Sequence, residues 1–290
     1  MVFSTRVELI GFDSFGIRSM ATFLETQDTT IFIDPAVSIA PIRYGLPPHE
    51  IELRRLNEVA TKITSRAYES EVIIVTHYHY DHHDLGDLVP IDIYRSKVVF
   101  IKDPQNNINV SQRIRAARFL KRISGLPKEV KIADSSMYFH GNTFIKISHP
   151  TFHGPTPKLG YVIQVLVKDS DKKLLFTSDV EGPVNKDAVE FMINNPADLV
   201  IVDGPPTYLF KAKKEVSDPE IALRELARYL TSYAPEYLII DHHLLRDLNY
   251  VEFYESLKPY LRKTKLLTAA EFMGKEPELL EAKRKELYEG

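Results

Sequence analysis

The sequence predicts a mixed α/β protein in which two sheets pack together and helices cover their outer faces. Strand patterns open the chain, strands and helices alternate in both halves, and neither a low-complexity linker nor a short repeat separates them. Layers of this kind bury the apolar face of each sheet and the apolar stripe of each helix. We therefore predict one domain that spans residues 1–290.

The first half of the chain supplies strands, a loop and two helices. Alternating and β-branched residues predict strands within 2–33, and four prolines predict a loop over 35–50 in which His49 precedes or caps a helix. Apolar residues three and four apart predict that helix, namely Leu53, Leu56, Ala60, Ile63 and Ala67. A short β-branched run at 72–75 is typical of a buried strand. The chain then continues with a strand at 97–101 and a helix at 109–124.

The second half repeats the alternation of strands and helices. Gly141-Asn142 predicts the turn of a hairpin within 136–148, and Asp218-Pro219 predicts the start of a helix at 218–233. The other expected strands are 129–133, 161–167, 173–177, 199–202, 237–240 and 266–268. The other expected helices are 185–194, 250–258 and an amphipathic C-terminal helix from about 276.

Composition is typical of a globular protein with a sizeable core. Of the 290 residues, 44% are hydrophobic and 27% are charged, and the net charge is −3. This balance gives no general reason to expect nucleic acid, and a solvated face explains the five basic residues of the helix 109–124 more simply. The absence of cysteine excludes disulfides and thiolate ligands. No membrane-spanning run and no signal peptide are recognisable, so we expect a cytoplasmic protein.

Metal-binding residue types crowd together directly after the buried strand. His77, His79, Asp81, His82 and His83 lie within seven residues of a chain that has ten histidines in all. Such crowding is unfavourable unless a cation holds the groups together, and imidazoles and carboxylates are ligands of first-row metals. In an extended segment His77 and His79 point the same way and can bind one ion. Asp81 and His82 follow as the chain turns and can reach a second ion.

The segment Thr76-His77-Tyr78-His79-Tyr80-Asp81-His82 resembles the signature of the metallo-β-lactamase superfamily. Over its whole length the chain is similar to a largely archaeal branch of that superfamily. The resemblance implies a four-layer αββα sandwich that binds one or two metal ions in loops at one edge. It also implies hydrolysis of an ester, thioester, amide or phosphodiester.

The resemblance indicates a third ligand for the first ion. The next superfamily motif is a histidine and glycine followed later by Gly-Tyr, and His153-Gly154 with Gly160-Tyr161 matches it. His149, which ends the preceding strand, is the alternative. Catalytic zinc sites commonly use three protein ligands, so His77, His79 and one of these two histidines would suffice.

The remaining ligands are expected at the ends of two later strands. Asp179 matches the aspartate that bridges two ions, and His242 matches the last ligand position, with His243 as the alternative. Asp241 is a candidate for orienting one of these two rings, and His243 for contacting substrate. The implied sites are His77, His79 and His153 for the first ion, Asp81, His82 and His242 for the second, and Asp179 as the bridge.

The implied activity is that of a dinuclear hydrolase in which a metal-bound hydroxide attacks the substrate. Asp81 is the expected catalytic residue, because it can orient the nucleophile or carry its proton, whereas His83 is expected to be an exposed neighbour or a proton donor. Two divalent ions are expected, with zinc first and iron or manganese as alternatives.

A phosphodiester or nucleic-acid substrate is favoured, and a thioesterase or lactonase is the alternative. A di-iron redox enzyme and a non-catalytic metal-binding protein are the alternatives of another class. The expected partner is therefore a small-molecule or nucleic-acid substrate. The sequence is also compatible with a homo-oligomer.

Overall fold

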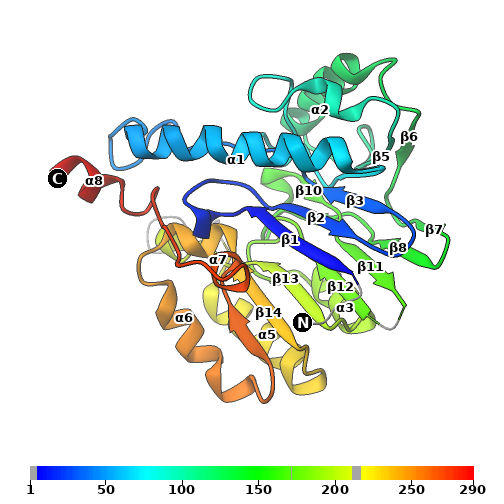
Figure 1. Ribbon diagram of the computed structural model, residues 1–290. Helices are drawn as coiled ribbons and strands as arrows, with labels where there is room; N and C mark the ends of the chain where they lie inside the picture. Colours follow the sequence, from blue (N-terminus) through cyan, green and yellow to red (C-terminus); the bar gives the residue numbers. More distant parts are fainter. Residues whose placement is uncertain (1–4, 171, 211–216) are drawn as a thin grey trace.

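Two sheets lie face to face between two layers of helices in the computed structural model, which describes residues 5–170, 172–210 and 217–290 (Figure 1). This arrangement confirms the predicted four-layer αββα sandwich. The first sheet has six strands in chain order, namely β1 (Arg6–Gly11), β2 (Ala21–Glu25), β3 (Thr30–Ile33), β4 (Val72–Val75), β5 (Val98–Ile101) and β6 (Glu129–Ile132). Strands β1 to β3 pair antiparallel and strands β3 to β6 pair parallel.

The second sheet has seven strands in the order β15-β14-β13-β12-β11-β8-β7. Its members are β7 (Met137–His140), β8 (Thr143–Ile147), β11 (Val165–Asp169), β12 (Lys172–Phe176), β13 (Leu199–Asp203), β14 (Tyr237–Asp241) and β15 (Lys265–Leu267). The predicted hairpin is present as β7 and β8, and strands β12 to β15 are parallel. A separate two-stranded ladder joins β9 (Thr151–Phe152) to β10 (Tyr161–Val162).

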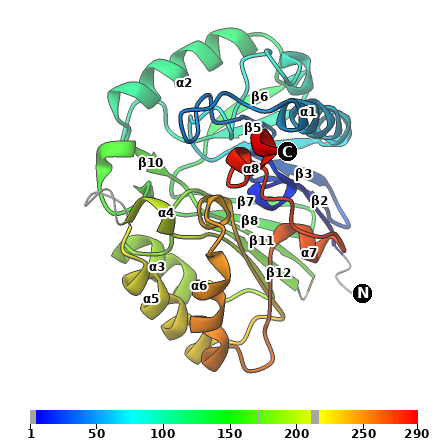
Figure 2. The same ribbon diagram turned by 90° about the vertical axis from the view of Figure 1, so that its left-hand side faces the viewer.

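The longer helices cover the outer faces of both sheets (Figure 2). Their bounds are α1 (Glu50–Glu69), α2 (Val110–Ile123), α3 (Lys186–Asn194), α4 (Thr207–Phe210), α5 (Pro219–Ser232), α6 (Tyr250–Leu257), α7 (Ala269–Phe272) and α8 (Arg284–Glu289). Short 3-10 turns include η1 (Asp13–Phe15) and η4 (His242–Arg246). One apolar cluster joins α1 and α2 to the first sheet, and another joins α3, α5 and α6 to the second.

Strand β4 shows how the core positions the polar cluster that follows it. Val72 and Ile74 pack between the two sheets, whereas Ile73 and Val75 pack under α1 and α2. Successive side chains of a strand point to opposite faces, so a strand that is buried on both sides must be apolar throughout. The four-residue run is therefore held rigidly, and its carboxyl end carries the histidine motif.

The predicted start signals of two helices are confirmed. The His49 ring accepts a hydrogen bond from the Ile51 amide, and the Glu52 carboxylate accepts one from the His49 amide, which makes a reciprocal cap for α1. Asp218 caps α5, with Pro219 in its first turn.

Two predicted elements are wrong in extent. The C-terminal helix begins at Arg284 instead of about 276, because the preceding segment is held by tertiary contacts such as the bond from the Glu278 amide to the Ser14 carbonyl. The expected strand 161–167 is interrupted after Val162, because the Ile163 amide turns to the Thr76 carbonyl beneath the histidine motif. Within the described part of the chain, no helix is both long and apolar enough to cross a bilayer.

Candidate metal centre

The loop that carries the histidine motif is fixed by hydrogen bonds at both of its ends. At its start, the Thr76 amide and hydroxyl donate to the two oxygens of Asp34, at 2.8 and 2.6 Å. Further on, the His79 carbonyl accepts hydrogen bonds from the amides of His82 and His83, at 3.0 and 3.1 Å. This tight turn brings the His82 ring back toward His77, with ring centroids 4.1 Å apart.

The candidate ligand atoms form several overlapping groups, of which two match the expected sets and one places His243, the alternative ligand, beside Asp179 and His242. In the first group, His77, His79, His153 and Asp179 offer ligand atoms that all lie within 4.8 Å of one another. In the second group, the same holds for Asp81, His82 and His242. The structure thus brings together all seven residues that the sequence singled out, in the two sets that were expected.

Asp179 lies between the two groups. Its Oδ1 atom is 2.9 Å from Nε2 of His82, in the second group. Its Oδ2 atom is 3.2 Å from Nε2 of His153 and 3.5 Å from Nε2 of His77, in the first group, and 3.4 Å from Nε2 of His242. A carboxylate in this position can offer one oxygen to each of two cations.

His153 reaches the centre through the β9–β10 ladder. Its amide donates to the Gly160 carbonyl at 3.0 Å, which closes the loop between the two glycines of the motif. Gly154 has a φ of +75°, and a Cβ there would lie 2.5 Å from Oε2 of Glu181, so the turn requires glycine.

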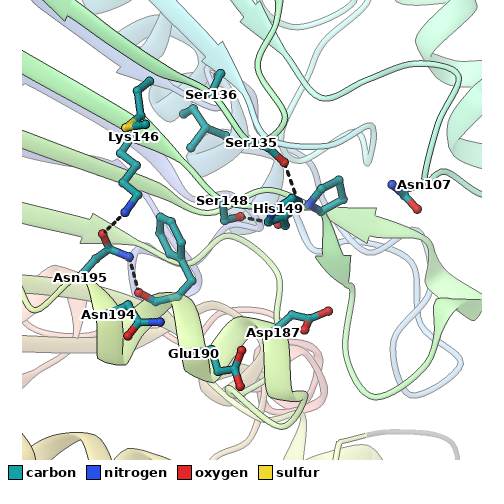
Figure 3. Close-up of a pocket in the computed structure, with 14 residues that line it drawn as sticks. Asn107, Ser135, Ser136, Lys146, Ser148, His149, Asp187, Glu190, Asn194 and Asn195 are labelled. Atoms are coloured by element: carbon teal, nitrogen blue, oxygen red, sulfur yellow. Dashed lines mark hydrogen bonds between the residues drawn. The ribbon is translucent and has the colours of Figure 1, made fainter.

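The competing histidine, His149, lies elsewhere. Figure 3 shows it on the wall of a separate cavity of about 480 Å³ between β8 and α3. There its Nδ1 atom is 2.7 Å from Oγ of Ser135. Among the described residues, His149 belongs to neither group of ligand atoms.

Buried aspartates hold the rings of the second group. Asp34 Oδ2 lies 2.8 Å from Nδ1 of His82, and Asp13 Oδ2 lies 2.8 Å from Nδ1 of His242. Contacts of this kind fix the ring orientation and leave Nε2 for a metal ion. Neither aspartate was predicted, although Asp34 ends a strand and Asp13 lies in the glycine loop between the first two strands.

One expectation about the histidine pair is corrected. Asp241 orients neither ring, because its oxygens accept hydrogen bonds from the backbone amides of Ser14, His242 and Ala269. Instead, the ring of His243 is held through Nδ1 by Asp203, at 2.9 Å. Asp203 also ends a parallel strand, and that position is the signal that could have identified it.

His83 is buried, which corrects the prediction of an exposed neighbour. It has no exposed surface, its Nδ1 atom lies 2.9 Å from the His79 carbonyl oxygen, and its ring packs against Tyr80 and Phe119. Burial lowers the pKa of His83 to about 4, so the ring is neutral near pH 7. This geometry gives His83 a packing role behind the motif.

The donor set fits divalent metal ions. Within the described residues, Nε2 of His77, Nε2 of His82 and Oδ1 of Asp179 are buried without a hydrogen-bond partner. Although His82 Nε2 and Asp179 Oδ1 lie 2.9 Å apart, their orientation makes no hydrogen bond. Leaving buried polar atoms unpaired is costly, and three such atoms at one point fit the ligands of a cation.

Burial and the neighbouring carboxylates shift the pKa values of the histidines in opposite directions. Burial, followed by the neighbouring His82, lowers the pKa of His77 to about 3. For His82, burial lowers the pKa, but the carboxylates of Asp179 and Asp34 outweigh it and raise the pKa well above its usual value. For His242, burial likewise opposes protonation, yet Asp179 helps raise the pKa to about 10. Burial also opposes protonation of His153 in the first group, but Asp179 outweighs it and raises the pKa of His153, so the carboxylates favour positive charge in both groups.

The centre opens to solvent on one side. Five of the seven candidate ligands are at most 2% exposed, whereas His79 and Asp81 are partly exposed. Tyr80, between these two, is 42% exposed. His79, Tyr80 and Asp81 therefore form the solvent-facing side of the centre.

The fold and this site together define a metallo-β-lactamase fold protein. Solved structures with the same fold include YhfI from Bacillus subtilis, with 13% identity, a TM-score of 0.56, and 91% of this chain and 96% of that chain covered. They also include unliganded yeast PDE1, with 12% identity and a TM-score of 0.56. That match covers 91% of this chain and 97% of PDE1. CmlA, a diiron β-hydroxylase from Streptomyces venezuelae, matches with 11% identity and a TM-score of 0.54. That match covers 92% of this chain and 53% of CmlA.

Sequence comparison places the chain more narrowly. It is 49% identical over 286 residues to a UPF0282 protein of Metallosphaera sedula, covering 98% of this chain and 92% of the relative. It is 46% identical over 286 residues to a UPF0282 protein of Korarchaeum cryptofilum, covering 98% and 94%. The chain therefore belongs to the UPF0282 family. No protein-family model matches it.

Proposed function

We propose that this protein is a dinuclear metal-dependent hydrolase that cleaves phosphodiesters. The observation that carries the proposal is the pair of ligand groups that meet at Asp179, whose Oδ1 lies near His82 of the second group and whose Oδ2 lies near His153 of the first. Two-metal sites built around a shared carboxylate suit hydrolytic displacement, because one ion can stabilise the attacking oxygen and the other the leaving oxygen.

The ligand assignment follows the two groups. His77, His79 and His153 would hold one ion, Asp81, His82 and His242 the other, and Asp179 would bridge them. Divalent ions held there, with zinc the expected metal, would act as Lewis acids and make water a nucleophile at neutral pH.

The protein's own groups orient the reactants. Asp81 lies at the solvent opening, with its Oδ2 atom 3.7 Å from Nε2 of His242, where it can accept a proton from the attacking water. Because Asp203 holds Nδ1 of His243, the other nitrogen of that neutral ring, Nε2, is an acceptor that can receive a hydrogen bond from the substrate. The His82 and His242 rings are fixed by Asp34 and Asp13, so little reorganisation is needed during reaction.

A fixed cation beside the centre favours an anionic substrate. The Nη2 atom of Arg246 lies 3.7 Å from Oδ2 of Asp81, and its Nε donates to Asp13 at 2.8 Å. Burial opposes its charge, but Asp13 and other neighbours raise the pKa of Arg246 well above its usual value, so it stays charged. A guanidinium at this place suits a phosphodiester better than a neutral lactone or thioester.

The test is hydrolysis of a matched panel by metal-loaded protein. We expect turnover of bis(p-nitrophenyl) phosphate and much slower turnover of p-nitrophenyl acetate, a thioester and a lactone. The Arg246→Lys variant keeps the charge but loses the planar fork, and should lower kcat/KM for the phosphodiester more than for any residual acetate activity. Preferred turnover of the thioester or lactone would assign a thioesterase or lactonase instead.

A redox function is the second candidate, because the same nitrogen and oxygen donors can bind two irons. One structural neighbour, CmlA, is a diiron β-hydroxylase, and the present chain covers 53% of it. Elemental analysis of the purified protein separates the two functions. Two irons per chain together with no hydrolysis of the panel would favour the redox function, and two zinc ions with turnover would favour the hydrolase.

A further inference from the structure

Helix α2 has a strongly basic composition that contrasts with the rest of the chain. Its 14 residues, VSQRIRAARFLKRI, include four arginines and one lysine and no acidic residue, whereas the whole protein has a net charge of −3. Like charges on one helix repel each other, so this concentration costs some stability. The composition alone would suit a merely solvated helix face.

These cations lack acidic partners within the described residues. None of the five forms an ion pair, whereas Arg224 and Arg228 on α5 both pair with Glu225. Arg118 and Arg122 are exposed, and both lie on the same side of α2 as Arg115, since residues three and seven apart share a helix face. We call Arg115, Arg118 and Arg122 the arginine stripe, which runs for about 10 Å along the helix.

The arginine stripe borders the loop of the metal centre. Arg115 Nη1 donates to the Tyr78 carbonyl at 3.2 Å, and Arg122 Nε donates to the Leu85 carbonyl at 3.0 Å, so the two ends of the stripe contact the two ends of that loop. The guanidinium carbon of Arg115 lies 5.1 Å from the centre of the Tyr80 ring. Figure 2 shows α2 across the upper part of the molecule, above β10, the strand that closes the His153 loop.

An exposed aromatic ring therefore lies between the stripe and the metal centre. Tyr80 is 42% exposed and is followed directly by Asp81, the candidate ligand at the solvent opening. Cations that track a phosphate backbone, together with an aromatic ring on which a base can stack, are the usual elements of single-strand recognition. Base stacking on one ring contributes about 1–3 kcal/mol and tolerates any sequence.

We propose that the arginine stripe and Tyr80 bind a single-stranded nucleic acid and lead its backbone to the metal centre. This inference rests on the proposed phosphodiesterase function and specifies its substrate class. The exposed guanidinium groups contact phosphates without reading sequence, and Tyr80 stacks one base beside the scissile linkage. The substrate is therefore a polynucleotide strand, and recognition is independent of base identity.

The test measures binding of fluorescein-labelled oligouridine by anisotropy over a series of salt concentrations, with the protein as purified and after EDTA treatment. The double variant Arg118→Ala/Arg122→Ala removes two phosphate contacts. For single strands each contact contributes about 0.7 to the slope of log affinity against log salt, so the slope should fall by about 1.4 and the affinity by about 25-fold at 0.1 M salt. The single variant Arg118→Glu, which leaves the bond to Leu85 intact, should also weaken binding.

The matched control is Arg224→Ala/Arg228→Ala on α5, which removes the same charge from a helix of the other outer layer. We expect this control to bind oligouridine like the wild type. The proposal would be overturned if both double variants lost the same affinity for oligouridine, or if the wild type did not bind oligouridine. It would also be overturned if the wild type bound phosphatidylglycerol vesicles in place of oligouridine. Turnover of bis(p-nitrophenyl) phosphate without oligouridine binding would overturn the stripe and leave the proposed hydrolase standing. Binding that persists in EDTA would support the stripe even if no substrate of the panel were hydrolysed.

Discussion

Replacing Asp34 by asparagine should weaken the second metal site selectively. The Asp34 carboxylate accepts three hydrogen bonds, from the Thr76 amide, from the Thr76 hydroxyl and from Nδ1 of His82. Asparagine keeps the size and tolerates the φ of +53° at this position, so the backbone should be preserved. The amide, however, can offer only one acceptor oxygen.

Either orientation of the new amide places a donor against a donor. If the amide nitrogen faces His82, the ring must move its proton from Nδ1 to Nε2, the atom that would bind the ion. If the nitrogen faces the Thr76 amide, the start of the metal loop loses its anchor. Loss of such a supporting contact typically lowers metal affinity by about 10- to 100-fold, which corresponds to about 1.4–2.8 kcal/mol for the second ion.

The assay is a zinc titration in competition with a chromophoric chelator, which resolves the two dissociation constants. Asp34→Asn should raise the dissociation constant of the second site by that factor and leave the constant of the first site nearly unchanged. Asp134→Asn is the matched control, because Asp134 is a half-buried carboxylate that binds Lys102 and the Asp103 amide away from the ligand atoms. Equal weakening of both ions in Asp34→Asn, or the same effect in Asp134→Asn, would refute the reasoning.

Two further predictions concern the third ligand and the C-terminal segment. His153→Ala should lose the first ion whereas His149→Ala should retain it, as measured by metal content after dialysis; the reverse result would move the site to His149. The Arg284 guanidinium forms a fully buried bidentate pair with Glu52. The substitution Arg284→Met should lower the free energy of unfolding, measured by urea denaturation, by about 3–5 kcal/mol, because the buried Glu52 charge loses its partner. The double variant Arg284→Met/Glu52→Leu should recover most of that loss, and no recovery would contradict this explanation.

Local patterns sufficed for the elements that carry the ligands. The apolar run Val72–Val75 predicted a buried strand, and strand ends before Asp179 and His242 predicted where those residues would emerge. Periodicity and strand ends are properties of contiguous residues, and for this reason sequence alone can show them. The assignment of the seven residues as ligands stays a prediction until metal is measured.

The residues that hold the ligands in place could not be paired from sequence. Asp13 contacts His242 across 229 positions of the chain, and Asp34 contacts His82 across 48. Contacts at such separations depend on which strands become neighbours, and that topology is set by packing of the whole core. Asp241 shows the converse error, because adjacency to His242 suggested a ring contact where the carboxylate instead serves backbone amides.

Local sequence patterns also failed for the segment before Arg284, where a helix was predicted and none formed. Residues before Arg284 have helical spacing of apolar side chains, yet the chain there follows contacts such as the 2.6 Å pair between Glu281 and Arg18. Helix propensity is a weak preference that tertiary contacts override.

The most direct test of the central claim is metal stoichiometry by titration in wild type and Asp179→Ala. If Asp179 bridges two ions, the wild type should bind two divalent ions per chain. The alanine variant should lose affinity at both sites, because the bridging charge no longer offsets repulsion between neighbouring cations. Retention of two tightly bound ions in Asp179→Ala, or a wild type that binds none while folded, would contradict the account.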